Sequence, residues 1–278
     1  NVSTTSGSAN GCQFNTVSGC TFDLGNVAVN GSAIFAGPYV FNSATTATWT
    51  ANSADIHRSL TINNNNFSNI YTGIAFRGPT TAQARNLVVT NNILTGVGGG
   101  ATTAYGTYML YTDSIRWDNN AAVGDLAHTT TSYLFFTSTN CGGYIQINGN
   151  TVTLQSNTTT STTYGIYSLS NIGGNRRINN NTVRFGGFPS ITSGALYGLY
   201  ATYSGGNNNI LMEMNGNTIS GEVIPPTTSA SVYLMYNFGS TGTNRKIHMK
   251  NNTISNITKA NSGTIYCIYP GTADSVDA

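Results

Sequence analysis

Nine carboxylates are the acidic side chains that this 278-residue chain offers for acid–base catalysis or metal binding. Two carboxylates that face one cleft can hydrolyse a glycosidic bond, one as the acid and the other as the base or nucleophile. The densest group comprises Asp113, Asp118 and Asp125, with Arg116 between the first two and His128 close behind. These residues are the best catalytic candidates in the sequence. Whether they meet depends on the elements that carry them.

A short repeat runs along the chain and predicts those elements. Its pattern is apolar-x-x-Asn-x-apolar, as in Ile147 to Val152 (INGNTV). The asparagines of the eight copies are Asn15, Asn65, Asn92, Asn120, Asn150, Asn181, Asn217 and Asn252. After a first interval of 50 residues, the intervals range from 27 (Asn65 to Asn92) to 36 (Asn181 to Asn217). Such intervals are typical of one repeat in a solenoid.

Each copy of the repeat predicts two short strands that meet at the asparagine. Apolar residues alternate before it (Ile145, Ile147) and after it (Val152, Leu154), which is the period of a β-strand. We expect the asparagine itself to adopt the left-handed backbone conformation of the bend. In stacked coils, equivalent asparagines would hydrogen-bond in a ladder, with each bond contributing about 1 kcal/mol.

A second series of similar segments supplies a third strand in each coil. It reads YGTY from Tyr105, and it returns as YLFF, YGIY, YGLY, YLMY and YCIY. Because alternate residues of a strand share a face, we expect the first and the apolar third residues to point inward. The fourth residues would then form an outward row of rings: Tyr108, Phe136, Tyr167, Tyr200, Tyr236 and Tyr269. Such a row could be a structural ladder, or a binding surface for sugars or a partner protein.

This pattern resembles the pectate-lyase-like superfamily of right-handed parallel β-helices. The residues that carry the resemblance are Gly165-Ile166 and Gly198-Leu199, each followed by an Asn-rich segment. The resemblance predicts an all-β, single-stranded solenoid of about eight to nine coils over residues 10–270. Residues 1–9 would be a polar lead-in, and residues 271–278 a tail or a link to another segment. The long first interval would hold a loop, or an extra coil with Ala33-Ile34-Phe35 as a strand.

Composition excludes several classes of function. Charged residues make up 7% of the chain, against about 25% in typical domains, and the net charge is +2. We therefore expect no nucleic-acid partner. No apolar run approaches the roughly 18 residues that a membrane-spanning helix needs. The four cysteines lack metal-binding spacing, so we expect no metal and no cofactor; only Cys12 and Cys20 lie near enough in sequence to suggest a disulfide.

The predicted elements separate the carboxylates. Asp113 precedes a predicted strand and Asp125 follows it, so we do not expect them to share a face with Asp118. Three coils separate Asp118 from Glu213, on the order of 14 Å at about 4.8 Å per coil, which is too far for a glycosidase pair.

We therefore expect a non-enzymatic segment of a secreted or cell-surface bacterial protein, similar to the β-helical regions of adhesins. It would act as a rigid stalk or fibre element that contacts glycans or other surface proteins. No cap is recognisable, so we expect either that it is part of a longer chain or that it joins copies of itself or neighbours end to end. The alternative is a polysaccharide lyase or glycoside hydrolase that uses Asp113, Asp118, Asp125 and Arg116. The superfamily it resembles includes lyases, hydrolases, phage spikes and adhesins, so the resemblance does not choose between them.

Overall fold

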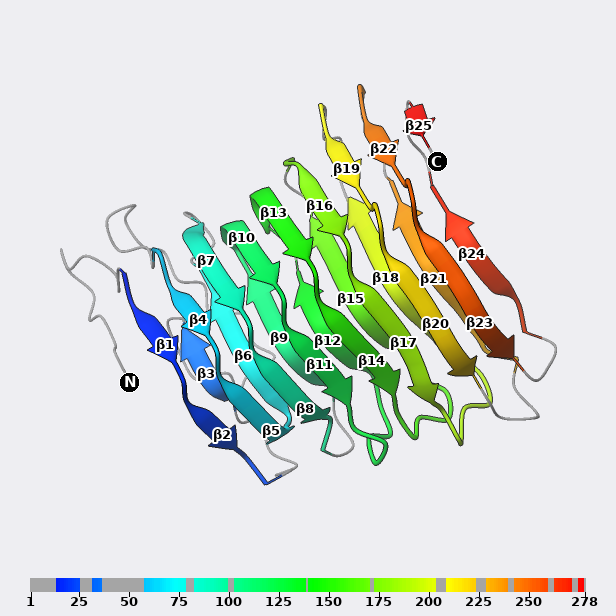
Figure 1. Cartoon of the computed structure of the whole chain (residues 1–278), viewed down its shortest axis with the longest axis horizontal. Helices are drawn as coiled ribbons and strands as arrows, with labels where there is room; N and C mark the ends of the chain where they lie inside the picture. Colours follow the sequence, from blue (N-terminus) through cyan, green and yellow to red (C-terminus); the bar gives the residue numbers. More distant parts are fainter. Residues whose placement is uncertain are drawn as a thin grey trace.

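A computed structural model describes residues 14–25, 32–36, 58–78, 83–99, 103–138, 140–170, 173–203, 209–223, 229–239, 243–259, 263–271 and 275–277. The regular elements of these residues are strands, which form three parallel sheets. In Figure 1 the strands lie side by side along the long axis of the molecule, with β1 and β25 at opposite ends. Each repeat of the sequence therefore forms one coil of a stack.

Each sheet takes one strand from each coil. The first sheet contains, in order, β1 (Thr16–Ser18), β4 (Thr61–Asn63), β7 (Ala84–Thr90), β10 (Thr112–Asp118), β13 (Gly142–Asn148), β16 (Arg176–Asn179), β19 (Leu211–Glu213), β22 (Lys246–His248) and β25 (Ser275–Asp277). The second contains β2 (Thr21–Asp23), β5 (Asn66–Ile70), β8 (Ile93–Val97), β11 (Ala121–Gly124), β14 (Thr151–Gln155), β17 (Thr182–Gly187), β20 (Thr218–Val223) and β23 (Thr253–Lys259). The third contains β3 (Ser32–Ala36), β6 (Thr72–Arg77), β9 (Ala104–Leu110), β12 (Ser132–Thr137), β15 (Thr163–Ser170), β18 (Ala195–Tyr203), β21 (Ser231–Phe238) and β24 (Ile265–Tyr269).

The chain therefore visits the three sheets in turn, as the sequence predicted. A strand pairs with the strands three before and three after it, so β10 lies between β7 and β13. Inward residues of successive coils stack in the core, for example Val89, Trp117, Ile147 and Ile178, all fully buried. A parallel β-solenoid with three strands per turn is confirmed. β25 pairs with β22, so part of the expected C-terminal tail continues the first sheet.

The regular, fully enclosed part of the solenoid is shorter than predicted. Six ladder asparagines, from Asn65 to Asn217, are at most 1% exposed, and five hydrogen-bonded steps join them. This part has about five turns, not the eight to nine that the sequence suggested. The end strands lie outside it because they have a neighbour on only one side; the residues of β24, for example, are all exposed.

The first coil excludes one of the two alternatives for the long interval and corrects one ladder residue, while β3 contains the predicted strand Ala33-Ile34-Phe35. β1, β2 and β3 pair directly with β4, β5 and β6, so no extra coil lies between them, and residues 37–57 are outside the described residues. The ladder position of this coil is Cys20, whose backbone N–H donates to Asn65 Oδ1 over 2.9 Å. Asn15 instead precedes β1. Because Thr16 pairs with Thr61, Asn15 lies level with Leu60 and not with Asn65, so it is not a ladder residue. Cys12, the suggested disulfide partner of Cys20, lies outside the described residues.

The bend itself also differs from the prediction. Asn150 shows the ladder geometry: Nδ2 donates to Trp117 O (2.8 Å) and Asn181 Oδ1 (2.9 Å), and Oδ1 accepts from Asn120 N (2.8 Å). The left-handed residue is the one before the ladder position, such as Gly149 (φ 66°). The ladder asparagine was therefore wrongly assigned to the left-handed conformation. The side-chain amide of the ladder asparagine points into the core, so the residue before it adopts the left-handed conformation that makes the bend.

Candidate functional site: an aromatic strip

Two rows of aromatic rings run along the outer side of the third sheet. They come from the first and fourth residues of the Tyr-rich segments in β9, β12, β15, β18, β21 and β24, and we call them together the aromatic strip. Row one is Tyr105, Tyr133, Tyr164, Tyr197, Tyr233 and Tyr266; row two is Tyr108, Phe136, Tyr167, Tyr200, Tyr236 and Tyr269.

Strict alternation along the strand fails in these segments. In β15, Gly165 and Ile166 are both buried, whereas Tyr164 and Tyr167 on either side of them are half-buried on the outer face. The second residue also faces the core: a Cβ on Gly165 would lie 2.7 Å from Gly198 O and 2.8 Å from Leu154 Cδ1, and its equivalents Leu134 and Leu234 are fully buried. The fourth residues lie on the outer side, as expected. The first residues were wrongly assigned to the core, and their row doubles the width of the strip.

The rings of the strip are in contact from coil to coil. In row one, neighbouring ring centroids are 4.5–5.2 Å apart and the ring planes are within 8° of parallel. Such offset-stacked pairs contribute about 0.5–1.5 kcal/mol each beyond the burial of their area. A structural role is therefore built into the strip.

Row two changes direction halfway along the strip. Tyr108 and Phe136 are 18° from parallel, but the planes of Tyr167 and Tyr200 meet at 72°. After this point the two rows are steeply inclined to each other, by 66° in β18, 77° in β21 and 88° in β24. A ligand lying across these three coils would meet rings in two orientations.

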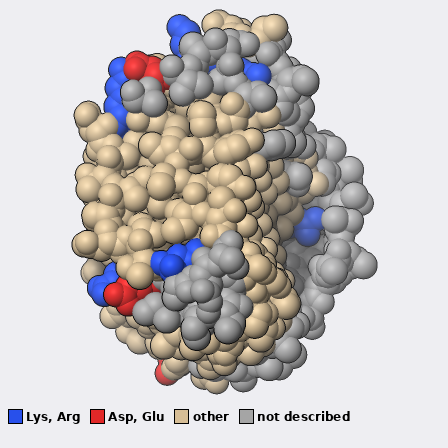
Figure 2. Space-filling view, turned by 90° about the vertical axis from the view of Figure 1, so that its right-hand side faces the viewer, with Lys and Arg blue, Asp and Glu red and all other residues tan. Residues whose placement is uncertain are grey.

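The strip is uncharged, and its tyrosine phenols are not ionised. Strands β9, β12, β15, β18, β21 and β24 contain no Asp, Glu, Lys or Arg. Burial raises the pKa of Tyr164 and Tyr167 above that of a free tyrosine, so their phenols are neutral at physiological pH. Neutral phenols both donate and accept hydrogen bonds. The end view of Figure 2 shows that charged side chains are also few among the described residues at that end of the molecule.

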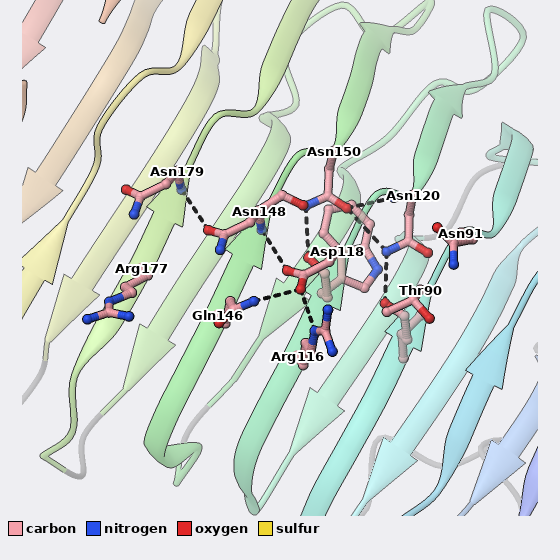
Figure 3. A network of polar contacts seen from close by, with 12 residues as sticks. Thr90, Asn91, Arg116, Asp118, Asn120, Gln146, Asn148, Asn150, Arg177 and Asn179 are labelled. Atoms are coloured by element: carbon pink, nitrogen blue, oxygen red, sulfur yellow. Dashed lines mark hydrogen bonds and ion pairs between the residues drawn. The ribbon is translucent and has the colours of Figure 1, made fainter. Parts of the chain in front are cut away.

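The carboxylate proposed as a catalytic group, Asp118, is held in a network on the first sheet (Figure 3). Its Oδ2 accepts from Arg116 Nε (2.5 Å) and Gln146 Nε2 (2.7 Å), and its Oδ1 accepts from the backbone N–H of Asn148 (2.9 Å). The side chain is 5% exposed. Both oxygens therefore already have donors, and the contacts tie β10 to β13.

The other two candidate carboxylates do not join Asp118. Asp113 stands at the opposite end of β10, where Oδ1 accepts from Ser114 Oγ (3.1 Å). Asp125 follows β11 of the second sheet and accepts from the backbone N–H of Ala127 (2.8 Å). Among the residues that the structure describes, no group of three His, Cys, Asp or Glu side chains could hold a metal ion. The catalytic constellation considered from the sequence is therefore not assembled.

Asp118 belongs to a second ladder that sequence reasoning missed. Asn148 Oδ1 accepts from the backbone N–H of Asn179, and Asn179 Oδ1 accepts from that of Asn215, at 3.2 and 2.8 Å. Asn215 Oδ1 continues the column to the backbone N–H of Lys250. A signal was available, because these polar residues stand two places before the ladder asparagines. Asp118 occupies the equivalent position in its coil, and its carboxylate accepts the equivalent hydrogen bond, from the backbone N–H of Asn148.

Comparison with protein-family models, with curated proteins and with solved structures finds no match for this chain. In the described part of the chain, no helix has the length and apolar character to cross a membrane. Function must therefore be argued from the geometry of the strip and the sheets.

Proposed function

We propose that this chain is a rigid structural and adhesive segment of a secreted or cell-surface bacterial protein, and that the aromatic strip contacts glycans or another surface. The observation that carries the proposal is the continuity of the strip over six coils, without a charged residue in its strands. Right-handed winding and kinship with the pectate-lyase-like superfamily stay predictions within this proposal, as does end-to-end association.

Rigidity follows from the hydrogen bonding between coils. Each sheet is continuous from the first to the last described coil, so bending the rod would break ladder bonds in at least one sheet. The buried asparagines add further bonds at one corner, where Asn92 donates from both its backbone and its side chain to Asn120 Oδ1 at 3.0 Å. A solenoid of this kind holds a surface row of side chains at a fixed spacing, which suits repeated contact with an extended partner.

The chemistry of the strip favours a neutral, partly apolar partner. Tyrosine combines a large apolar ring with one hydroxyl group, and such residues are enriched where proteins bind ligands with mixed surfaces. Sugars have both apolar C–H faces and hydroxyl groups, so rings and phenols could contact them together. From β18 to β24, where the ring planes of the two rows are steeply inclined to each other, a ligand would meet ring faces of one row beside the ring edges and phenols of the other.

Binding to immobilised polysaccharides tests the proposal. The double variant Tyr200→Ser/Tyr236→Ser removes two half-buried rings from adjacent coils, and we expect at least a tenfold weaker retention of whichever neutral polymer binds. The control is Tyr144→Ser, which removes an exposed tyrosine from the first sheet. If no polymer is retained by the unchanged protein, or if both variants bind equally, the strip is not a binding surface.

The enzymatic alternative makes a different prediction. A lyase or hydrolase would release soluble products from uronic-acid or neutral polymers, and Asp118→Ala would abolish that release. We favour the adhesive role because Asp118 already has three donors and stands apart from Asp113 and Asp125. Turnover that is lost in Asp118→Ala would overturn the proposal.

A further inference from the structure

A separate pocket lies on the second sheet, where β17, β20 and β23 run side by side. Its volume is about 510 Å³, and its lining includes Arg184, Gly186, Ser220, Glu222 and Asn256. This size falls within the range of small-molecule sites, roughly 300–1,000 Å³. The pocket belongs to a different sheet from the aromatic strip, so the two surfaces can be altered independently.

The hollow exists because the strands bulge at this point. The register of β14 with β17 shifts between Leu154 and Gln155, and that of β20 with β23 shifts between Ser220 and Gly221. Asn256, with a φ of 53°, lies opposite the second shift. Bulges are frequent beside binding sites, because they change the direction of the neighbouring side chains.

Two glycines line the pocket where adjacent coils approach closely. A Cβ on Gly186 would lie 2.7 Å from Thr153 Cγ2, and one on Gly221 would lie 2.2 Å from Phe185 O. Gly221 also has a φ of 116°, a conformation that other residues rarely adopt. Glycine is therefore favoured at both positions by the close approach of the neighbouring coil.

The polar side chains around the pocket are available for a ligand. None of the ion pairs among the described residues includes Arg184 or Glu222, and both side chains are exposed. Arg184 can only donate hydrogen bonds and an ionised Glu222 can only accept them, while Ser220 and Asn256 can do both. One positive and one negative charge leave the pocket lining neutral overall.

This set of groups matches a neutral polyhydroxylated ligand. Each hydroxyl of a sugar donates one hydrogen bond and accepts others, so neighbouring hydroxyls can satisfy a carboxylate and a guanidinium together. An anionic ligand would suit Arg184 but would be repelled by Glu222, and a cationic ligand would meet the reverse. We propose that this pocket binds a single neutral pyranose unit of a glycan. The choice of a sugar rests partly on the proposed glycan contact of the strip.

Titration with free monosaccharides tests the assignment. Glucose, galactose, mannose, N-acetylglucosamine and glucuronate would each be added to the folded protein, and binding followed by saturation-transfer NMR and calorimetry. We expect at least one neutral sugar to bind with a millimolar or lower Kd. Arg184→Ala and Glu222→Gln should each weaken that sugar at least tenfold, whereas Lys246→Ala, an exposed cation of the first sheet, should change nothing. Because both pocket side chains are exposed, these variants should fold.

The outcomes separate the pocket from the strip. Loss of monosaccharide binding in Arg184→Ala, with binding retained in Tyr200→Ser/Tyr236→Ser, supports an independent pyranose site. Retention of polymers with no monosaccharide binding overturns the pocket and leaves the strip intact. Binding of glucuronate alone, or neutral-sugar binding that survives both pocket variants, also refutes the assignment.

Discussion

Replacing a ladder asparagine in the middle of the stack should destabilise the protein far more than its loss of side-chain volume suggests. In Asn150→Ala, the buried backbone N–H of Asn120 loses the Oδ1 acceptor at 2.8 Å. Trp117 O loses the Nδ2 donor at 2.8 Å. Asn181 Oδ1 keeps one donor, because the backbone N–H of residue 150 remains 3.0 Å away. Asn120 Nδ2 and Asn148 O also lose a bond, but each keeps another partner, so the loss falls mainly on the Asn120 N–H and Trp117 O.

The expected loss follows from these two groups. A buried polar group without a partner costs about 1–3 kcal/mol, so we expect Asn150→Ala to lose about 3 kcal/mol of unfolding free energy. The matched control is Asn252→Ala at the partly exposed end of the same ladder, where water can replace the lost bonds. That variant should lose about 1 kcal/mol.

Urea unfolding followed by circular dichroism measures both losses. The slope of the unfolding free energy with urea should be the same for both variants and the parent, so that the midpoints compare stability alone. Hydrogen exchange at the Asn120 amide gives a local check, since this N–H should exchange faster in Asn150→Ala. Equal losses in the two variants would refute the view that the buried ladder stabilises the stack.

Three further predictions follow from burial and backbone geometry. Burial raises the pKa of Tyr203 to about 12, and the pKa values of other buried tyrosines shift in the same direction. In the unfolded chain the phenols therefore lose their protons at a lower pH than in the folded protein. The unfolding free energy should fall as the pH rises above about 10. Thermal melting between pH 8 and pH 12 measures this fall. Burial likewise raises the pKa of the Cys141 thiol to about 11, so a thiol reagent at pH 8 should modify exposed Cys20 quickly and Cys141 only after unfolding; mass spectrometry identifies the modified peptides. Gly149→Val should cost about 2 kcal/mol in urea unfolding, because a β-branched residue is forced into the left-handed region at a φ of 66°.

Sequence periodicity was sufficient to predict the parallel three-sheet solenoid. The spacing of asparagines such as Asn92 and Asn150, with apolar residues alternating around them, specifies a coil that repeats because each copy must bury the same face. The ladder itself could be predicted for the same reason. The first coil could not, since Cys20 occupies the ladder position there and Asn15 only resembles a ladder residue in its local pattern.

The tertiary structure alone decided what faces outward and what comes together. The first tyrosines of the strip lie outside because two successive residues, such as Gly165 and Ile166, are buried between the rings, which alternation along one strand does not predict. Asp118 became a ladder residue because its neighbours across the sheet donate to it. The pocket beside Arg184 arises from bulges in separate coils. Contacts between coils join residues about thirty positions apart, so the residue pattern within a single repeat does not specify them.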